Sequence, residues 1–266
     1  MKAIVINLPQ ATERHAFQEQ QLKRLGVDFE WLWATTVSQI DTQDQLQLAQ
    51  HWERPLKLTE LACFLSHQRA WARVVAMNRP CLILEDDACL SIRLPEFLAL
   101  AEGLQGVDHL SLEIHHKAKW LGPTRALHGG LGIARLYQDR AGAAAYILWP
   151  GGARRLIDKA KSGQLALADA FIANQRRWIS LQADPVMAMQ AEVINWRGMQ
   201  TSLITSSCIQ ANQDLSVATG KTWRYRLRRL RGQMGIAWRK MTTLFVAHQR
   251  EPLIVAADFS DRRVHQ

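Results

Sequence analysis

The chain contains Pro80-Cys-Leu-Ile-Leu-Glu-Asp-Asp87, in which a run of strand-forming apolar residues leads directly into three carboxylates. Side chains alternate along a strand, so Glu85 and Asp87 are expected on one face and Asp86 on the other. Three adjacent acids repel one another and require a compensating cation. Mg²⁺ and Mn²⁺ prefer such hard oxygen ligands and also neutralise phosphate groups. The stretch therefore favours a site for a divalent metal and a phosphorylated ligand, with a solvated acidic turn as the alternative.

Strands and helices alternate around this stretch. Short apolar or period-two runs predict strands at 3–8, 27–33, 81–85, 109–114 and 141–149. Helical periodicity, with Gly or Pro near the ends, predicts helices at 12–25, 59–77, 95–103 and 153–161. Residues 115–135 are expected to form a long loop, and Trp31 and Trp33 are expected in the core. The alternation predicts an α/β fold with a largely parallel central sheet flanked by helices, whose ligands bind at the carboxyl ends of the strands.

The formal net charge of +9 comes from one segment. Residues 221–250 hold nine basic residues and no acid, whereas the rest of the chain carries 24 residues of each sign. Large apolar side chains recur in this segment every three or four positions, at Trp223, Leu227, Leu230, Met234, Trp238, Met241 and Phe245. This pattern is typical of a helix lying on an anionic membrane surface. Packing of the apolar stripe on the rest of the protein, and nucleic-acid binding, are the alternatives; Gly232 and Gly235 could divide the segment into two helices.

Three motifs occur in an order that resembles a known family. They are Ile6-Asn7-Leu8 with the following Arg14, Glu60-x-x-Cys63-x-x-Ser66-His67 in a predicted helix, and Leu84-Glu85-Asp86-Asp87. This succession resembles glycosyltransferase family 25, the bacterial lipooligosaccharide and lipopolysaccharide glycosyltransferases. The resemblance covers residues 2–90, continues more thinly over 145–156 and at Asp169, and fades near residue 200. It implies a GT-A-like nucleotide-sugar-binding fold.

The resemblance also implies roles for individual residues. Glu85 corresponds to the first acid of the family's metal and nucleotide motif, near the donor ribose, and Asp87 to the last acid, on the metal. Asp86 would fix the turn or touch the donor sugar. Four positions are expected near uridine diphosphate, and an Arg among them can offer phosphate two parallel hydrogen bonds. These positions are Asn7, Arg14, Ala34 and Thr35. Ser66 and His67 match the family's Ser-His pair, with hydrogen bonding inside the helix as the alternative.

Asp169 is the candidate catalytic base. It stands alone in the apolar run Leu167-Ala-Asp-Ala-Phe171, and the resemblance supplies an Asp after the Tyr-containing strand. A carboxylate in this role takes the proton of the acceptor hydroxyl when the anomeric centre inverts. A helix cap is the alternative role for Asp169, and Glu113 is the alternative base.

The resemblance, together with the acidic strand end, implies a metal-dependent glycosyltransferase that transfers a hexose from a UDP-sugar, with inversion, to a lipooligosaccharide or lipopolysaccharide core sugar. Galactose is the favoured hexose and glucose the next, with Mn²⁺ or Mg²⁺ as cofactor. The predicted catalytic domain is 1–218, and 219–266 is a basic amphipathic helical segment for the membrane surface. No signal peptide or bilayer-spanning run stands out, so the expected location is the cytoplasm, at the inner face of the bacterial inner membrane. The alternative is a non-catalytic basic protein that binds membranes or nucleic acid; the enzyme is expected to bind no nucleic acid.

Overall fold

The computed structural model describes residues 1–40, 52–139, 142–162, 166–175, 178–199, 201 and 223–260. Its strands are β1 (Lys2–Asn7), β2 (Phe29–Trp33), β3 (Cys81–Glu85), β4 (Ala88–Leu90), β5 (His109–Ser111), β6 (Lys119–Ala126), β7 (Gly132–Gln138), β8 (Ala145–Leu148), β9 (Ser180–Asp184), β10 (Ala188–Gln190) and β11 (His248–Arg250). Its α-helices are α1 (Thr12–Leu25), α3 (Leu58–Met77), α4 (Leu94–Glu102), α5 (Pro150–Lys161), α6 (Ala168–Ala173), α7 (Ala191–Trp196) and α8 (Trp223–Thr242). Two short 3₁₀ helices span Val37–Gln39 and Ala256–Phe259. Each strand and helix predicted from the sequence is present; the bounds of 12–25 and 81–85 are as predicted, and one or both ends of the others are shifted.

The main sheet is mixed. Within the described residues its strand order is β11-β6-β7-β9-β5-β8-β3-β1-β2, and β4 and β10 form a separate small sheet. The pairs β1/β2, β1/β3 and β5/β9 are parallel, whereas β3/β8, β5/β8, β7/β9, β6/β7 and β6/β11 are antiparallel. The prediction of a largely parallel sheet is therefore wrong. The apolar pattern of a buried strand reports its burial on both faces but not its direction.

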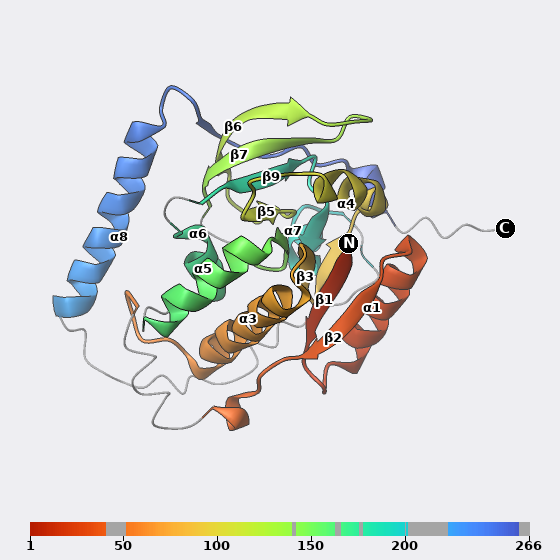
Figure 1. Ribbon diagram of the computed structural model, residues 1–266, viewed down its shortest axis with the longest axis horizontal. Helices are drawn as coiled ribbons and strands as arrows, with labels where there is room; N and C mark the ends of the chain where they lie inside the picture. Colours follow the sequence, from red (N-terminus) through yellow and green to blue (C-terminus); the bar gives the residue numbers. More distant parts are fainter. Residues whose placement is uncertain are drawn as a thin grey trace.

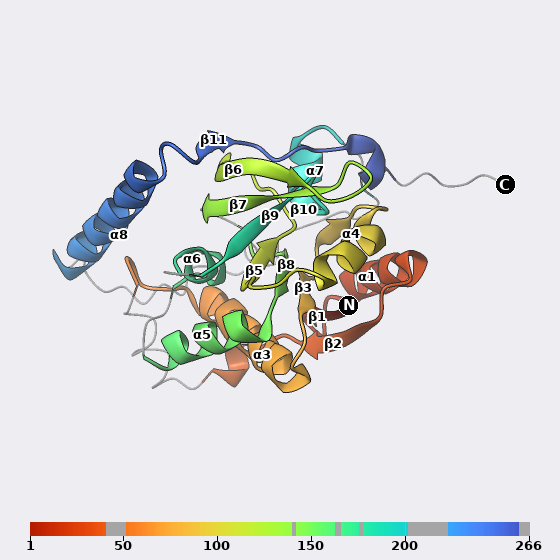
Figure 2. The ribbon, with the colours of Figure 1, turned by 45° about the horizontal axis from the view of Figure 1, so that its top comes forward.

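Helices cover both faces of this sheet, as Figure 1 and Figure 2 show. Ile4 and Ile83 belong to a buried cluster with residues of α3, α5 and α6, whereas Val5 and Leu84 belong to a second cluster with residues of α1 and α4. Consecutive residues of β1 and β3 thus pack into opposite layers, as strand alternation requires. The result is an α/β sandwich.

The stretch predicted as a loop, 115–135, forms most of a β-hairpin. β6 and β7 pair antiparallel, and Gly129 and Gly130 between them have φ angles of +57° and +78°. The loop prediction is wrong because β6 lacks a period-two pattern. Its last four residues are all exposed and include Pro123, and its register with β7 shifts.

The tryptophans of β2 lie nearer to solvent than predicted. Trp31 is half-buried, and Trp33 is 48% exposed. Both rings stack with the imidazole of His15 on α1, at centroid distances of 3.9 and 5.7 Å. The core prediction is wrong for Trp33 because β2 is the edge strand of the sheet.

One edge of the sheet collects the residues that follow several strands. β1, β2, β3 and β5 run in the same direction, so Glu85 and the residues just after it lie beside the end of β1 at Asn7. The backbone N–H of Ala34, after β2, donates to the carbonyl of Asn7 at 2.8 Å. β8 runs the opposite way, so its amino end brings backbone N–H groups to this edge.

α8 is one continuous helix, not two (Figure 1), and the side chains of its apolar stripe, with Phe245 just after the helix, are exposed. The seven stripe residues are between 39% and 101% exposed: Trp223, Leu227, Leu230, Met234, Trp238, Met241 and Phe245. On the opposite face, Arg239 donates to the carbonyl of Ala173, and the ammonium of Lys240 lies 5.2 Å from the ring centroid of Trp120. The stripe therefore does not pack on the sheet or its helices. None of the helices that the structure describes is long and apolar enough to cross a bilayer.

After α8 the chain returns to the main sheet. β11 pairs with β6, and Nη1 of Arg250 lies 2.9 Å from Oδ2 of Asp184 in β9. Phe259 is buried in a cluster with Ile194 of α7. Residues 248–259 are thus bound to the same body as β6 and β9. The division of the chain at residue 218 stays a prediction.

Candidate active site

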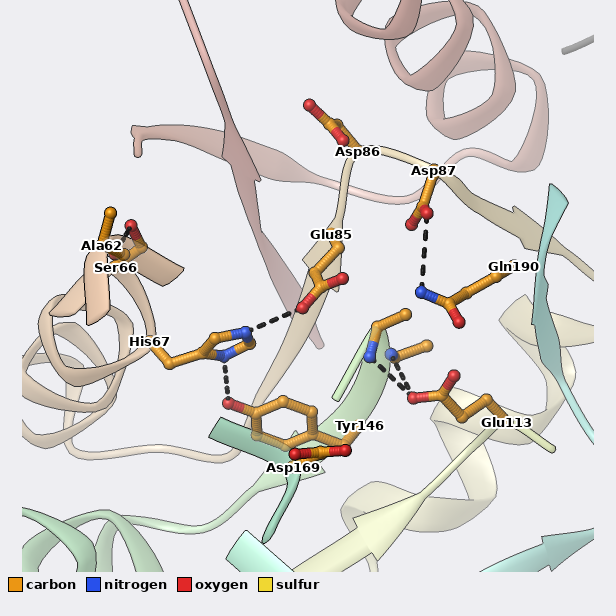
Figure 3. A network of polar contacts seen from close by, with 12 residues as sticks. Ala62, Ser66, His67, Glu85, Asp86, Asp87, Glu113, Tyr146, Asp169 and Gln190 are labelled. Carbon is orange, nitrogen blue, oxygen red and sulfur yellow. Dashed lines mark hydrogen bonds and ion pairs between the residues drawn. The ribbon is translucent and has the colours of Figure 1, made fainter. Parts of the chain in front are cut away.

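Three carboxylates lie at the end of β3, where Glu85 is the last residue of the strand and Asp86 and Asp87 follow in a turn (Figure 3). Oε1 of Glu85 lies 3.0 Å from Nε2 of His67, and Asp87 faces Gln190. Asp86 points away from both. This arrangement matches the predicted alternation, in which Glu85 and Asp87 share a face.

Two side chains from the N-terminal part of the chain hold Asp86. Asn7 Nδ2 donates to Oδ2 of Asp86 at 2.8 Å, and Arg14 Nη1 donates to Oδ1 at 2.8 Å. Burial raises the pKa of Asp86, and the charge of the Arg14 guanidinium opposes that rise. Asp86 therefore ties β1 and α1 to the end of β3 and fixes the turn there.

Asp87 has an oxygen that nothing in the described residues satisfies. Gln190 Nε2 lies at the limit of hydrogen bonding from Oδ2, at 3.5 Å, while Oδ1 is buried and has no partner among those residues. Burial, together with the charges of Glu85 and Asp86, raises the pKa of Asp87 to about 7. A buried carboxylate oxygen without a partner is unfavourable, and a divalent cation that prefers oxygen ligands would satisfy it. The donor set fits Mn²⁺ or Mg²⁺.

Ser66 and His67 are consecutive on α3 and hold two different segments of the site. The hydroxyl of Ser66 donates to the carbonyl of Ala62 at 2.8 Å, and its oxygen accepts from the backbone N–H of Thr35 at 2.9 Å. His67 is completely buried and reaches Glu85. Both side chains thus fix the segments that carry Thr35 and Glu85, and the bond inside the helix considered for Ser66 is present.

Cys63, His67 and Glu85 offer ligand atoms within 4.8 Å of one another. Burial raises the pKa of the Cys63 thiol well above its usual range, which keeps the thiol protonated. Nε2 of His67 is already bonded to Glu85. This group fits a hydrogen-bonded cluster better than a metal site.

Asp169 lies in the first turn of α6, on the side of the site where Figure 3 shows Tyr146. Its Oδ1 accepts from the backbone N–H of the next residue, Ala170, at 2.6 Å, but Leu167 and not Asp169 is the N-cap residue of α6, so the helix-cap alternative is wrong. Burial is the main cause that raises the pKa of Asp169 to about 6, and the charge of Glu85 adds to the rise. The carboxylate is therefore mostly deprotonated at neutral pH.

Glu113 and Gln190 also belong to the site. Glu113 is 1% exposed, and its Oε1 accepts from the backbone N–H groups of Ala144 and Ala145 at 2.7 and 3.2 Å. Burial raises the pKa of Glu113 to about 8. The sequence indicates Glu113 as a site residue, because it follows the apolar run of β5 much as Glu85 ends the apolar run of β3. No sequence pattern indicates Gln190, because only the pairing of β4 with β10 brings it to Asp87.

A family model described as "Glycosyltransferase family 25 (LPS biosynthesis protein)" matches residues 1–172. A glycosyltransferase 25 family member of Anopheles gambiae is 31% identical to this chain over 93 residues, and one of Aedes aegypti is 33% identical over 94. Each match covers 31% of this chain, but only 16% and 15% of those relatives. A crystal structure of a glycosyltransferase involved in the glycosylation of the major capsid of PBCV-1 aligns with a TM-score of 0.39 at 7% identity, over 71% of this chain and 91% of that one. The family model covers well over half of the sequence, so this chain belongs to glycosyltransferase family 25.

Proposed function

We propose that the protein transfers a hexose from a UDP-sugar, with inversion and on a GT-A-like fold, to a sugar of the lipooligosaccharide or lipopolysaccharide core. Galactose is the favoured hexose and glucose the next. Membership of family 25 supports sugar transfer, and the family description names LPS biosynthesis. The observation that carries the proposal is the buried Oδ1 of Asp87, which has no partner among the described residues and lies at the edge where β1 and β3 end together.

A divalent cation, Mn²⁺ or Mg²⁺, is part of this proposal. Asp87 would hold it, because its oxygen lacks a partner among the described residues and its carboxylate is crowded by two further acids. When bound, such a cation neutralises the negative charge that develops on the departing diphosphate. The fixed geometry of Asp86 keeps Asp87 at the edge of the sheet.

The nucleotide is proposed to bind beside the ends of β1 and β2. Oδ1 of Asn7 is also buried without a partner among the described residues, and the uracil ring offers an N–H donor to such an oxygen. Ala34 and Thr35 follow β2 at the same edge, and Glu85 would accept from the hydroxyls of the ribose. Arg14, already bonded to Asp86, supplies positive charge near the phosphates.

Asp169 is proposed as the base. The acceptor oxygen forms a bond to C1 of the donor sugar, the bond from C1 to the diphosphate oxygen breaks, and UDP leaves. The acceptor proton goes to the Asp169 carboxylate, whose pKa of about 6 is suited to this transfer near neutral pH.

Anionic lipid is proposed as the partner of residues 221–250, which would place the enzyme at the inner face of the bacterial inner membrane. The outward apolar stripe of α8 and the nine basic residues of that segment support this location. Charge complementarity favours a lipid surface over a second copy of this basic chain.

A donor screen tests the proposed activity. UDP-galactose, UDP-glucose and UDP-N-acetylhexosamines are each incubated with the protein and Mn²⁺, and released UDP is measured with and without EDTA. The expected result is release that EDTA stops, fastest with UDP-galactose. Binding to any polyanion that salt weakens, with no turnover of any donor, would favour the non-catalytic basic protein instead.

A further inference from the structure

A continuous hydrogen-bonded chain leads from the core to Glu85. Trp71 and His67 lie one turn apart on α3, and Tyr146 lies on β8 beside them. Figure 3 shows His67 and Tyr146. Trp71 Nε1 donates to the hydroxyl of Tyr146 at 2.9 Å, that hydroxyl lies 2.9 Å from Nδ1 of His67, and Nε2 of His67 lies 3.0 Å from Oε1 of Glu85. The Trp, Tyr and His side chains are at most 1% exposed.

The chemistry of these groups fixes the direction of the first hydrogen bond and allows the following directions for the other two. An indole N–H can only donate, so the oxygen of Tyr146 accepts from Trp71. The phenol then has one hydrogen to donate, and Nδ1 of His67 is its partner in the structure. A neutral imidazole with Nδ1 as acceptor carries its hydrogen on Nε2, which donates to Glu85. Burial raises the pKa of Tyr146 well above its usual range, so the phenol keeps its hydrogen.

This chain fixes one oxygen of Glu85. The Glu85 side chain is 26% exposed, so it also reaches the surface of the site. A free glutamate on a surface samples several rotamers, and a hydrogen bond from a buried, immobile ring restricts them. Oε2 is then held in a defined position from which it can accept hydrogen bonds.

We propose that Tyr146 and Trp71 are positioning residues, which act through His67 to hold Glu85 ready to accept a hydrogen bond from the ribose of the donor nucleotide. The identity of the ligand in this inference rests on the proposed function. The series of hydrogen bonds from Trp71 to Glu85 does not depend on it. A carboxylate fixed in this way recognises hydroxyl donors, as acidic residues do at the ribose of other nucleotides. The protein therefore prefers UDP over dUDP, and that preference depends on the Tyr146 hydroxyl.

The test uses the full-length protein and its variant Tyr146→Phe. Tyr137→Phe is the matched control, since Tyr137 is half-buried on β7, which does not neighbour β8 in the sheet. Imidazole ¹⁵N spectra, assigned with a His67→Asn variant, report which nitrogen of His67 carries the hydrogen. The dissociation constants of UDP and dUDP are measured in the presence of Mn²⁺. Thermal unfolding checks that the variants fold.

The expected parent spectrum shows His67 with hydrogen on Nε2. In Tyr146→Phe the resonance of Nδ1 shifts, because that nitrogen loses its hydrogen-bond donor, while Tyr137→Phe leaves it unchanged. UDP binding by Tyr146→Phe weakens by about tenfold or more, as for loss of a hydrogen bond to a charged group, with little change for dUDP. A parent spectrum with hydrogen on Nδ1, or an unchanged UDP to dUDP ratio in Tyr146→Phe, overturns the inference. The parent spectrum shows which nitrogen of His67 carries the hydrogen, so it tests the inference even if the variant does not fold. A parent that shows the Nε2 tautomer but binds no UDP overturns the proposed function and leaves the hydrogen-bond chain standing.

Discussion

Asp86 and Asp87 are neighbours in the chain, yet their carboxylates have opposite surroundings. Asp86 receives hydrogen bonds from Asn7 and Arg14, whereas Oδ1 of Asp87 has no partner in the described part of the chain. A carboxylate whose oxygens are hydrogen-bonded within the protein stabilises the fold, whereas a buried carboxylate oxygen without a partner is unfavourable until a ligand binds it. Side chains far away in the sequence therefore decide which of two adjacent acids is available to a metal.

Asp169→Asn is expected to lower kcat by about a hundredfold or more with unchanged donor affinity, because a general base contributes about 10²–10⁴-fold to rate. The activity of the parent falls as the pH drops through about 6, where the carboxylate takes up a proton. The variant lacks that titrating group, so this acidic limb becomes flat. Steady-state kinetics against pH, with a UDP-sugar and a soluble acceptor, measure both effects.

Asp158→Asn is the matched control, because Asp158 is an exposed acid on the neighbouring helix α5. Its kinetics should equal those of the parent. Near-normal turnover in Asp169→Asn, with the acidic limb retained, would move the base to Glu113.

Glu113→Gln is expected to stabilise the protein at mildly alkaline pH. Burial raises the pKa of Glu113 from its ordinary 4.5 to about 8, so between these values the unfolded chain loses a proton that the folded protein keeps. The stability of the parent therefore declines as the pH rises through that window. Gln keeps the acceptor for Ala144 and Ala145 without the charge, so the melting temperature of the variant should exceed that of the parent by a growing margin up to about pH 8.

Glu13→Gln, at an exposed position of α1, provides the comparison for thermal unfolding at several pH values. A margin between Glu113→Gln and the parent that stays constant with pH would contradict the raised pKa.

For single helices and strands, the sequence predicts where an element ends and which periodicity it has better than it predicts which strand or side chain the element contacts. α1 ends where predicted, because Gly26 adopts the left-handed conformation with a φ of +65°. β3 is predictable from its apolar run, and its end places Glu85–Asp87. The hairpin of β6 and β7 is not predictable, because cross-strand pairing replaces the missing alternation. Gln190 reaches Asp87 across 103 positions of sequence, a contact that no local pattern encodes.

Trp223→Ser combined with Trp238→Ser is expected to weaken binding to phosphatidylglycerol vesicles by about tenfold or more, because two large apolar side chains no longer enter the lipid. Both side chains point away from the rest of the protein, at 66% and 65% exposure, so folding and turnover on a soluble acceptor should not change. Vesicle sedimentation with phosphatidylglycerol and with neutral phosphatidylcholine measures the effect.

Trp196→Ser is the control, since Trp196 is equally exposed but lies on α7. Equal losses in both variants would mean that vesicle binding is unspecific. Concentration-dependent dimers of the parent, abolished by the α8 substitutions, would assign the stripe to a second copy of the chain.

At the scale of the whole molecule, the strand order assembles the site. β8 lies between β3 and β5 and runs against both, so its amino end meets their carboxyl ends. This reversal supplies the backbone N–H groups that hold Glu113, and it places Tyr146 beside His67. The α/β class follows from the alternation of elements in the sequence, whereas the reversal had to be seen in the structure.

The carboxylates at the end of β3 are proposed to bind a nucleoside diphosphate through a divalent cation. Calorimetric titration of UDP into the parent and into Asp87→Asn, each with Mn²⁺ and with EDTA, tests whether they do. The parent is expected to bind UDP with Mn²⁺ and to lose that binding in EDTA, and Asp87→Asn is expected to fold normally but to bind UDP no better with Mn²⁺ than without it. If the variant binds UDP and Mn²⁺ as the parent does, Asp87 does not hold the cation.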